Sequence, residues 1–157
     1  MRSITQFFLL CLLGPFGTCL ADNQTIGPNT ELTPSEVVQI VVDALKSNDP
    51  TNNDDGIATV FEFASPGNKS VTGPLQRFTD MIKGGFGDML NHVKSEFGEI
   101  DIEDKTALQA VWLTSPDGSE TGYVFQLGKQ TTGEYENMWM TESVWPIGKR
   151  KPQGQSI

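Results

Sequence analysis

The hydrophobic pattern of this chain changes its period once, near Asn91, and this change constrains the fold more than any other feature. Before Asn91, apolar residues recur at the spacing of three and four that is typical of helices. After it, apolar and polar residues alternate, as they do in strands with one buried face. Helices followed by strands predict an α+β domain, in which N-terminal helices pack on one face of an antiparallel four-stranded sheet.

The first helix has the clearest start signal in the chain. Thr33 is a suitable N-cap, Pro34 occupies the first helical position, and Glu36 completes a capping box. The helix is expected to end before Pro50, because a residue that precedes proline is disfavoured in the helical region. Its apolar side chains cover most of the circumference, which predicts an almost enclosed helix: Val37, Val38, Ile40, Val41, Val42, Ala44 and Leu45.

Two further helices are predicted before the strands. One begins at a cap from Asp54 or Asp55 and stops at Ser65-Pro66, after which a polar loop is expected. The other follows Gly73-Pro74 and ends at Gly84-Gly85, with one short helical turn after it.

Four strands follow, with turn signals between them. They are predicted at 93–102 with a bulge at Gly98, at 106–114, around Tyr123 to Leu127, and at 138–145, where Pro146 ends the last strand. Ser115-Pro-Asp-Gly118 predicts a tight turn between the second strand and the third, because Pro presets one corner and Gly accepts a left-handed one.

The first 21 residues have the features of a signal peptide. A short apolar run follows Arg2, and small residues precede a cleavage point after Ala21. Cys19 offers the alternative of a lipoprotein anchor, although Thr18 fits that motif poorly. We therefore expect an arm at 22–32, one domain at 33–147 and a flexible basic tail at 148–157. The protein would be secreted, or periplasmic or lumenal according to the host.

Charge and cysteine content limit the partners. The net charge of −9 disfavours nucleic acid and anionic membrane surfaces, and no segment is long enough to span a bilayer. Both cysteines, Cys11 and Cys19, fall in the predicted leader, so the exported domain has no thiol for a metal, a disulfide or catalysis. No cofactor is expected.

Two stretches carry a family resemblance that covers about 32–145. They are Asp54-Asp-Gly-Ile-Ala-Thr-Val-Phe-Glu-Phe-Ala-Ser-Pro66 and Thr72-Gly-Pro-Leu-Gln-Arg-Phe78. They resemble a family without an assigned activity in the nuclear-transport-factor-2-like (NTF2-like) superfamily. The resemblance implies a curved sheet wrapped around helices as an open cone. The superfamily contains isomerases, dehydratases, ligand-binding proteins and dimerisation modules, so the fold does not define the function.

Candidate polar sites are few. His92 is the sole histidine, and it could act as a general base at the mouth of a cone or simply hydrogen-bond to its neighbours. Asn53, Asp55 and Glu62 approach the spacing of a calcium loop, but Thr51 stands where Asp is needed, so helix capping explains them better. The acidic residues Glu99, Asp101, Glu103 and Asp104 could act as acid and base if burial separated their pKa values, but a solvated strand face explains them more simply. In a eukaryotic host, Asn23 and Asn68 would be glycosylation sequons in exposed loops.

Aromatic side chains concentrate in the predicted sheet. They could line an apolar ligand pocket, pack in the core or pair two copies of the chain: Trp112, Tyr123, Phe125, Trp139 and Trp145. We expect an exported, non-catalytic binding or dimerisation module with an apolar small-ligand pocket. The alternatives are an NTF2-like isomerase or hydrolyase that uses His92 or a buried carboxylate, and a structural assembly module.

Overall fold

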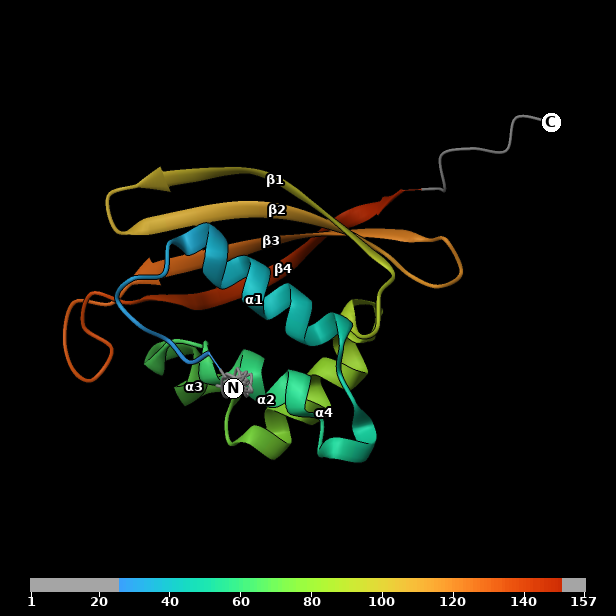
Figure 1. Cartoon of the computed structure of the whole chain (residues 1–157), viewed down its shortest axis with the longest axis horizontal. Helices are drawn as coiled ribbons and strands as arrows, with labels where there is room; N and C mark the ends of the chain where they lie inside the picture. The colour runs from blue at the N-terminus through green and yellow to red at the C-terminus, as the bar shows by residue number, and fades with distance from the viewer. Residues whose placement is uncertain (1–25, 151–157) are drawn as a thin grey trace, which may run out of the picture.

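The computed structural model describes residues 26–150, which fold into a layer of helices on one face of a four-stranded sheet (Figure 1). The predicted leader, both cysteines, Asn23 and the last seven residues of the predicted tail lie outside the described residues. Within 26–150, no helix has the length and apolarity needed to cross a membrane.

Helix α1 (Pro34–Lys46) confirms the predicted capping box and the predicted burial. The Thr33 hydroxyl accepts a hydrogen bond from the Glu36 N–H, and the Thr33 N–H donates to the Glu36 carboxylate at 2.8 Å. These two bonds satisfy donors that a helix start otherwise leaves without partners. The apolar face of α1 is buried against the sheet and the other helices: Val37, Val38, Val41, Val42 and Leu45.

Five shorter helical segments follow α1. They are η1 (Pro50–Asn52), α2 (Asp55–Glu62), α3 (Pro66–Thr72), α4 (Leu75–Gly85) and η2 (Gly87–Met89).

Helix α3 occupies the stretch that the sequence predicted to be a polar loop, so that prediction is wrong. Ser65 is its N-cap, and the Ser65 hydroxyl accepts from the Asn68 N–H at 3.1 Å. The Asn68 amide then donates to the carbonyl oxygens of Thr141 and Glu142. These contacts with a distant strand stabilise a short helix whose own sequence favours a helix only weakly.

The sheet has the order β1-β2-β3-β4, and each neighbouring pair is antiparallel. Its strands are β1 (Lys94–Glu103), β2 (Thr106–Thr114), β3 (Glu120–Lys129) and β4 (Trp139–Arg150). The predicted irregularity in β1 is confirmed by a register shift between Phe97 and Ile100. The predicted turn is also confirmed, because Gly118 has a φ of 82° and its N–H donates to the Ser115 carbonyl.

Strand β4 continues through Pro146 to Arg150, so the predicted end of this strand is wrong and the first residues of the predicted tail are part of the sheet. A proline is tolerated here because β4 is an edge strand. The extension also packs on the sheet. The Arg150 guanidinium lies 3.4 Å from the centre of the Trp112 ring, and Gly122 lets Trp112 and Ile147 approach the backbone closely.

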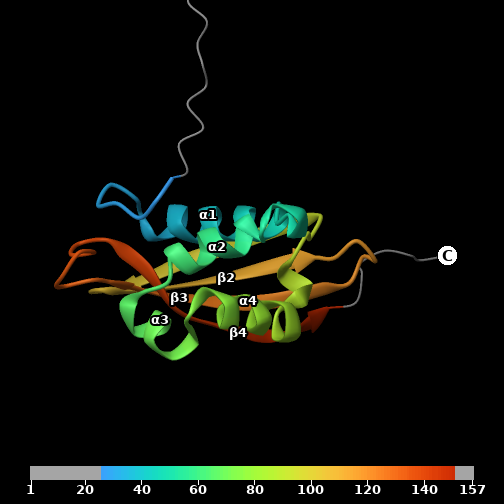
Figure 2. The ribbon, with the colours of Figure 1, turned by 90° about the horizontal axis from the view of Figure 1, so that it is seen from below.

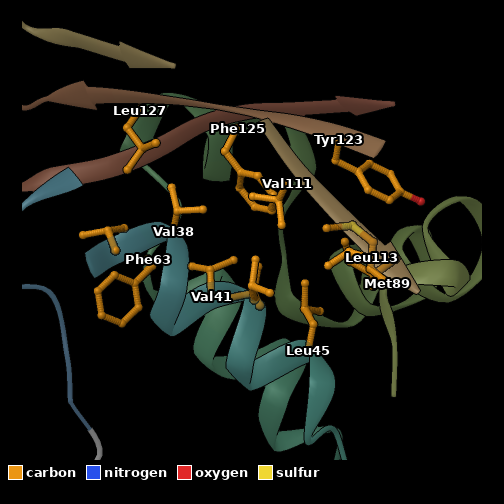
Figure 3. Close-up of a cluster of buried hydrophobic side chains, with 14 of the residues drawn as sticks. Val38, Val41, Leu45, Phe63, Met89, Val111, Leu113, Tyr123, Phe125 and Leu127 are labelled. Carbon is orange, nitrogen blue, oxygen red and sulfur yellow. The ribbon is translucent and has the colours of Figure 1, made fainter. Parts of the chain in front are cut away.

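The two faces of the sheet differ in what covers them, because the helices all lie on one side of the sheet (Figure 1), and Figure 2 shows the molecule from that side. The helices cover the inner face, where side chains of α1 point toward those of β2 and β3 (Figure 3). This inner face contains Val111, Leu113, Tyr123, Phe125 and Leu127. By register, the outer face contains Leu108, Trp112, Val124 and Trp145, which are exposed or half-buried. The packing confirms an α+β fold with its core on one side of the sheet.

Candidate ligand-binding site

A cavity of about 370 Å³ lies between the helices and the inner face of the sheet. Val71 of α3 and Met81 of α4 line it and are themselves 69% and 36% exposed. Gly67 of α3 and Ser143 of β4 line the same side. The cavity therefore opens to solvent where α3, α4 and β4 meet, and its inner end reaches the core.

The inner walls of this cavity are apolar. Side chains from α1, α2, α4, η2 and two strands form them: Val41, Leu45, Val60, Phe78, Ile82, Met89, Phe125 and Val144. Most of these residues are almost inaccessible to solvent and also belong to the core cluster. The core and the cavity thus share their walls, and an occupant would contact mostly carbon atoms.

The polar lining residues gather at one end, along the contact between α3 and β4. They are Asn68, Thr72, Thr141, Glu142 and Ser143. Most are already bonded within the chain, since Thr72 donates to Asn68 and Ser143 donates to Gln126. Thr141 differs, because its buried Oγ1 has no hydrogen-bond partner in the described part of the chain. A buried hydroxyl without a partner costs on the order of 1–3 kcal/mol.

Backbone hydrogen bonds hold this polar end in place. The Thr141 N–H donates to the Phe63 carbonyl, and the Ser65 N–H donates to the Thr141 carbonyl, both at 2.9 Å. The link between α2 and α3 is therefore joined to β4 as a short parallel bridge. A register shift in the β3–β4 pair leaves Glu142 without an opposing residue on β3. Such bulges turn a side chain out of the regular alternation of a strand, and the Glu142 side chain here lies against Gly128 of β3.

Glu142 is the one ionisable residue among the described residues that line the cavity. One carboxylate oxygen accepts from the Ser65 hydroxyl at 2.8 Å, and the other accepts from the Gln130 amide at 2.8 Å. No lysine or arginine within 26–150 forms an ion pair with it, since the three ion pairs found there involve other acids. Glu142 is thus a partly buried carboxylate without a counter-cation from the described residues.

The five aromatic candidates are divided between two faces of the sheet. Phe125 lines the cavity. Tyr123 and Trp139 pack against the core beside it, and burial raises the pKa of Tyr123 to about 12, with a smaller contribution from Asp88. Trp112 and Trp145 lie on the outer face, away from the helices. The structure therefore brings only Phe125 of this set to the cavity.

His92 lies outside the cavity lining. Its ring is 2% exposed, its Nδ1 lies 2.8 Å from the Met89 carbonyl oxygen, and its Nε2 has no partner among the described residues. Burial lowers the pKa of His92 below the usual value of 6.5, and the bond to Met89 partly opposes this shift. This geometry is that of a neutral histidine that ties η2 to the start of β1.

The calcium candidates do not come together. Helix α2 occupies most of the predicted loop, Asn53 has a left-handed backbone at the end of η1, and Asp55 accepts from the Gly56 N–H at 2.8 Å. Glu62 lies at the other end of α2. Across 26–150, no group of three or more His, Cys, Asp or Glu side chains is placed to hold a metal ion.

The remaining polar candidates also have defined positions. The acidic residues Glu99, Asp101, Glu103 and Asp104 are all exposed. Asn68 does not lie in the exposed loop expected of a sequon. It lies in α3 and is partly buried, and its amide nitrogen donates to two β4 carbonyls.

Sequence reasoning did not single out Glu142, Thr141 or the helix residues that form the cavity. Glu142 lies at a register shift between β3 and β4. No local sequence pattern in β4 predicts this shift, because register is a property of the strand pair. Val60 and Ile82 lie within helices that the sequence predicts, but nothing in their spacing indicates that their side chains leave a space between them.

A family model described as "Domain of unknown function (DUF4864)" matches residues 30–153. The matched segment contains every element of the fold and every residue that lines the cavity. No curated protein and no solved structure matches the chain.

Proposed function

The chain belongs to the DUF4864 family, and we propose that it is an exported, non-catalytic protein that holds a small apolar ligand in the cavity between its helices and its sheet. We further propose that the domain is an NTF2-like cone, in which this cavity is the interior. The order of helices before a four-stranded antiparallel sheet is compatible with that fold.

The cavity is the observation that carries this proposal. Its volume of about 370 Å³ lies within the roughly 300–1,000 Å³ typical of small-molecule sites. Binding sites of this kind combine apolar walls with a few polar groups that orient the ligand, and the cavity has the same composition.

The chemistry of the lining favours binding over catalysis. An isomerase or hydrolyase needs an acid or base within reach of its substrate, and usually a second group to receive or return the proton. Glu142 is the one such group at the cavity among the described residues, and both of its oxygens are engaged. His92, the catalytic candidate from the sequence, lies outside the lining.

Val60→Phe tests the proposal, because it places a ring in the wall of the cavity. The probe is 1-aminoanthracene, a neutral apolar dye whose fluorescence rises in apolar surroundings. We expect the wild-type chain to bind the dye and the variant to bind it at least about tenfold more weakly. Val60 is buried and lines the cavity, so the added ring occupies space that the ligand needs.

Val124→Phe is the matched control, because it adds the same ring on the outer face of β3. It should leave dye binding unchanged, and circular dichroism should show that both variants are folded. A wild-type chain that does not bind the dye, or two variants that bind it equally well, would contradict the proposal.

A second proposal concerns the outer face, where two copies of the chain would pair as a dimer. Leu108, Trp145 and Ile147 are 37%, 39% and 45% exposed there, and the helices lie on the opposite side of the sheet (Figure 1). Contiguous exposed apolar side chains often mark a protein interface. Sedimentation should show a dimer that Trp145→Glu dissociates, and a wild-type monomer at high concentration would overturn this proposal.

A further inference from the structure

We propose that the ligand of this cavity is an amphipathic amine, whose ammonium group lies at Glu142 and whose apolar body lies against the inner walls. The inference rests on the proposed function, since it assigns a chemical class to the occupant of the same cavity. Three properties of the site support it: the separation of polar from apolar lining, the sign of the charge, and the unused hydrogen-bonding capacity of the carboxylate.

The lining has a polar end and an apolar end. Asn68 and Thr72 of α3 and Thr141, Glu142 and Ser143 of β4 form the polar end, and the walls toward α1, α2 and β3 are apolar. A ligand that is apolar throughout would leave the Thr141 hydroxyl and the unused lone pairs of Glu142 without partners, which costs free energy when these groups are removed from water. A ligand with one polar end and one apolar end matches the polar end and the apolar walls of the cavity.

The only charge at the cavity within the described residues is negative. Glu142 has no cationic partner there, so an anionic ligand such as a fatty acid would meet a like charge in a partly dehydrated site. The net charge of −9 on the chain adds a field of the same sign, which attracts cations. The charge of the site therefore favours binding of a ligand with a cationic group and disfavours one with a carboxylate. It has little effect on the binding of a neutral alcohol.

The Glu142 carboxylate also has capacity for further bonds. An ionised carboxylate offers about four lone-pair sites, and Ser65 and Gln130 use two of them. A bond from an ammonium donor is about twice as strong as one between neutral groups.

A purely structural role for Glu142 is the competing explanation. Its bonds to Ser65 and Gln130 join β4 to the start of α3 and to the β3–β4 connection. If that were its whole role, the cavity would select ligands by their apolar surface alone, and the charge of the ligand would have no effect.

Octylamine, 1-octanol and octanoate distinguish these explanations, because they share one alkyl chain and differ only in the polar group. Each is used to displace 1-aminoanthracene from the wild-type chain near neutral pH, where octylamine is an ammonium ion and octanoate a carboxylate. We expect octylamine to bind about tenfold more tightly than 1-octanol, and octanoate to bind more weakly than both. N-acetyl-octylamine keeps an N–H but loses the charge, so it should bind about as 1-octanol does.

Glu142→Gln supplies the test on the protein. This change keeps a side chain that can bond to Ser65 and Gln130 but removes the charge, so octylamine affinity should fall about tenfold and 1-octanol affinity should change less than about threefold. Glu99→Gln is the matched control, because it removes the same charge from an exposed site on β1, outside the cavity. It should leave all three affinities unchanged.

The outcomes separate the two proposals. If the dye and all three octyl compounds fail to bind, the proposed function fails and this inference fails with it. If they bind with equal affinities, or if octanoate binds best, the cavity is a ligand site but the amine assignment is overturned. The comparison of octylamine with N-acetyl-octylamine uses the wild-type chain alone. It therefore shows whether the charge of the ligand affects its affinity even if Glu142→Gln does not fold.

Discussion

The inner and outer faces of the sheet carry similar side chains but have different surroundings. Phe125 on the inner face is fully buried, and the neighbouring Trp145 on the outer face is 39% exposed. Val111 and Val124 likewise lie on adjacent strands and face opposite sides, the first fully buried and the second half-buried. The helices account for the difference, because they cover only the inner face (Figure 1).

This contrast shows why aromatic content alone is a weak guide to a ligand site. Alternation along a strand assigns residues to two faces, but it does not say which face the helices will cover. Trp112 and Trp145 are prominent in the sequence and lie away from the cavity. The cavity is formed instead by aliphatic and phenylalanine side chains from several helices, together with one acid.

The largest expected effect compares an aromatic residue from each face. Phe125→Ala should lower the free energy of unfolding by about 3–5 kcal/mol, because it leaves a void in a packed core. Trp145→Ala should lower it by less than about 1.5 kcal/mol, since its ring is partly solvated already. Urea denaturation at low protein concentration measures both, and equal losses would mean that the outer face is as enclosed as the inner one.

A matched pair of valines sharpens the comparison with less disturbance. Val111→Ala should lower the free energy of unfolding by about 2 kcal/mol, and Val124→Ala by less than about 1 kcal/mol. The same two methyl groups are removed in both variants, so the difference reports only the surroundings. A larger loss at Val124 would reverse the assignment of the two faces.

The smallest expected effect concerns His92, which is buried beside η2 before the start of β1. Its folded-state pKa is lowered by burial, so its contribution to stability is complete above the unfolded value of about 6.5 and is lost as the pH falls through the lowered folded pKa. Tm should therefore begin to decline as the pH falls below about 6.5, above the range where most carboxylates titrate.

His92→Gln is the control for this pH dependence. It should have a lower Tm near neutral pH but a flatter profile over the same range, because the titrating group is gone. A profile as steep as that of the wild-type chain would show that other groups cause the decline.

The sequence predicted most of the architecture, because the relevant signals are local. The capping box at Thr33 and Glu36, the turn that ends at Gly118 and the change of period near Asn91 each act over a few residues. Two elements were wrong because distant contacts decide them. Helix α3 depends on bonds from Asn68 to β4, and the last part of β4 packs on Trp112.

The candidate site was less predictable, because it is a space and not a motif. Val60, Ile82 and Phe125 follow ordinary core patterns, and only their arrangement in three dimensions leaves a cavity between them. Glu142 lines that cavity at a register shift that is a property of the β3–β4 pair and not of β4 alone. His92 drew attention as the sole histidine, yet its ring is bonded to the Met89 carbonyl outside the cavity.

The most direct test of the central claim is a methyl NMR titration of the wild-type chain with 1-aminoanthracene. The cavity methyl groups of Val41, Val60 and Ile82 report on the inner side, and those of Leu108 and Val124 report on the outer face. A ligand held in the cavity predicts large saturable shifts at the first set and none at the second. Shifts centred on the outer face, or no shifts at a saturating dye concentration, would contradict the claim that the cavity is the binding site.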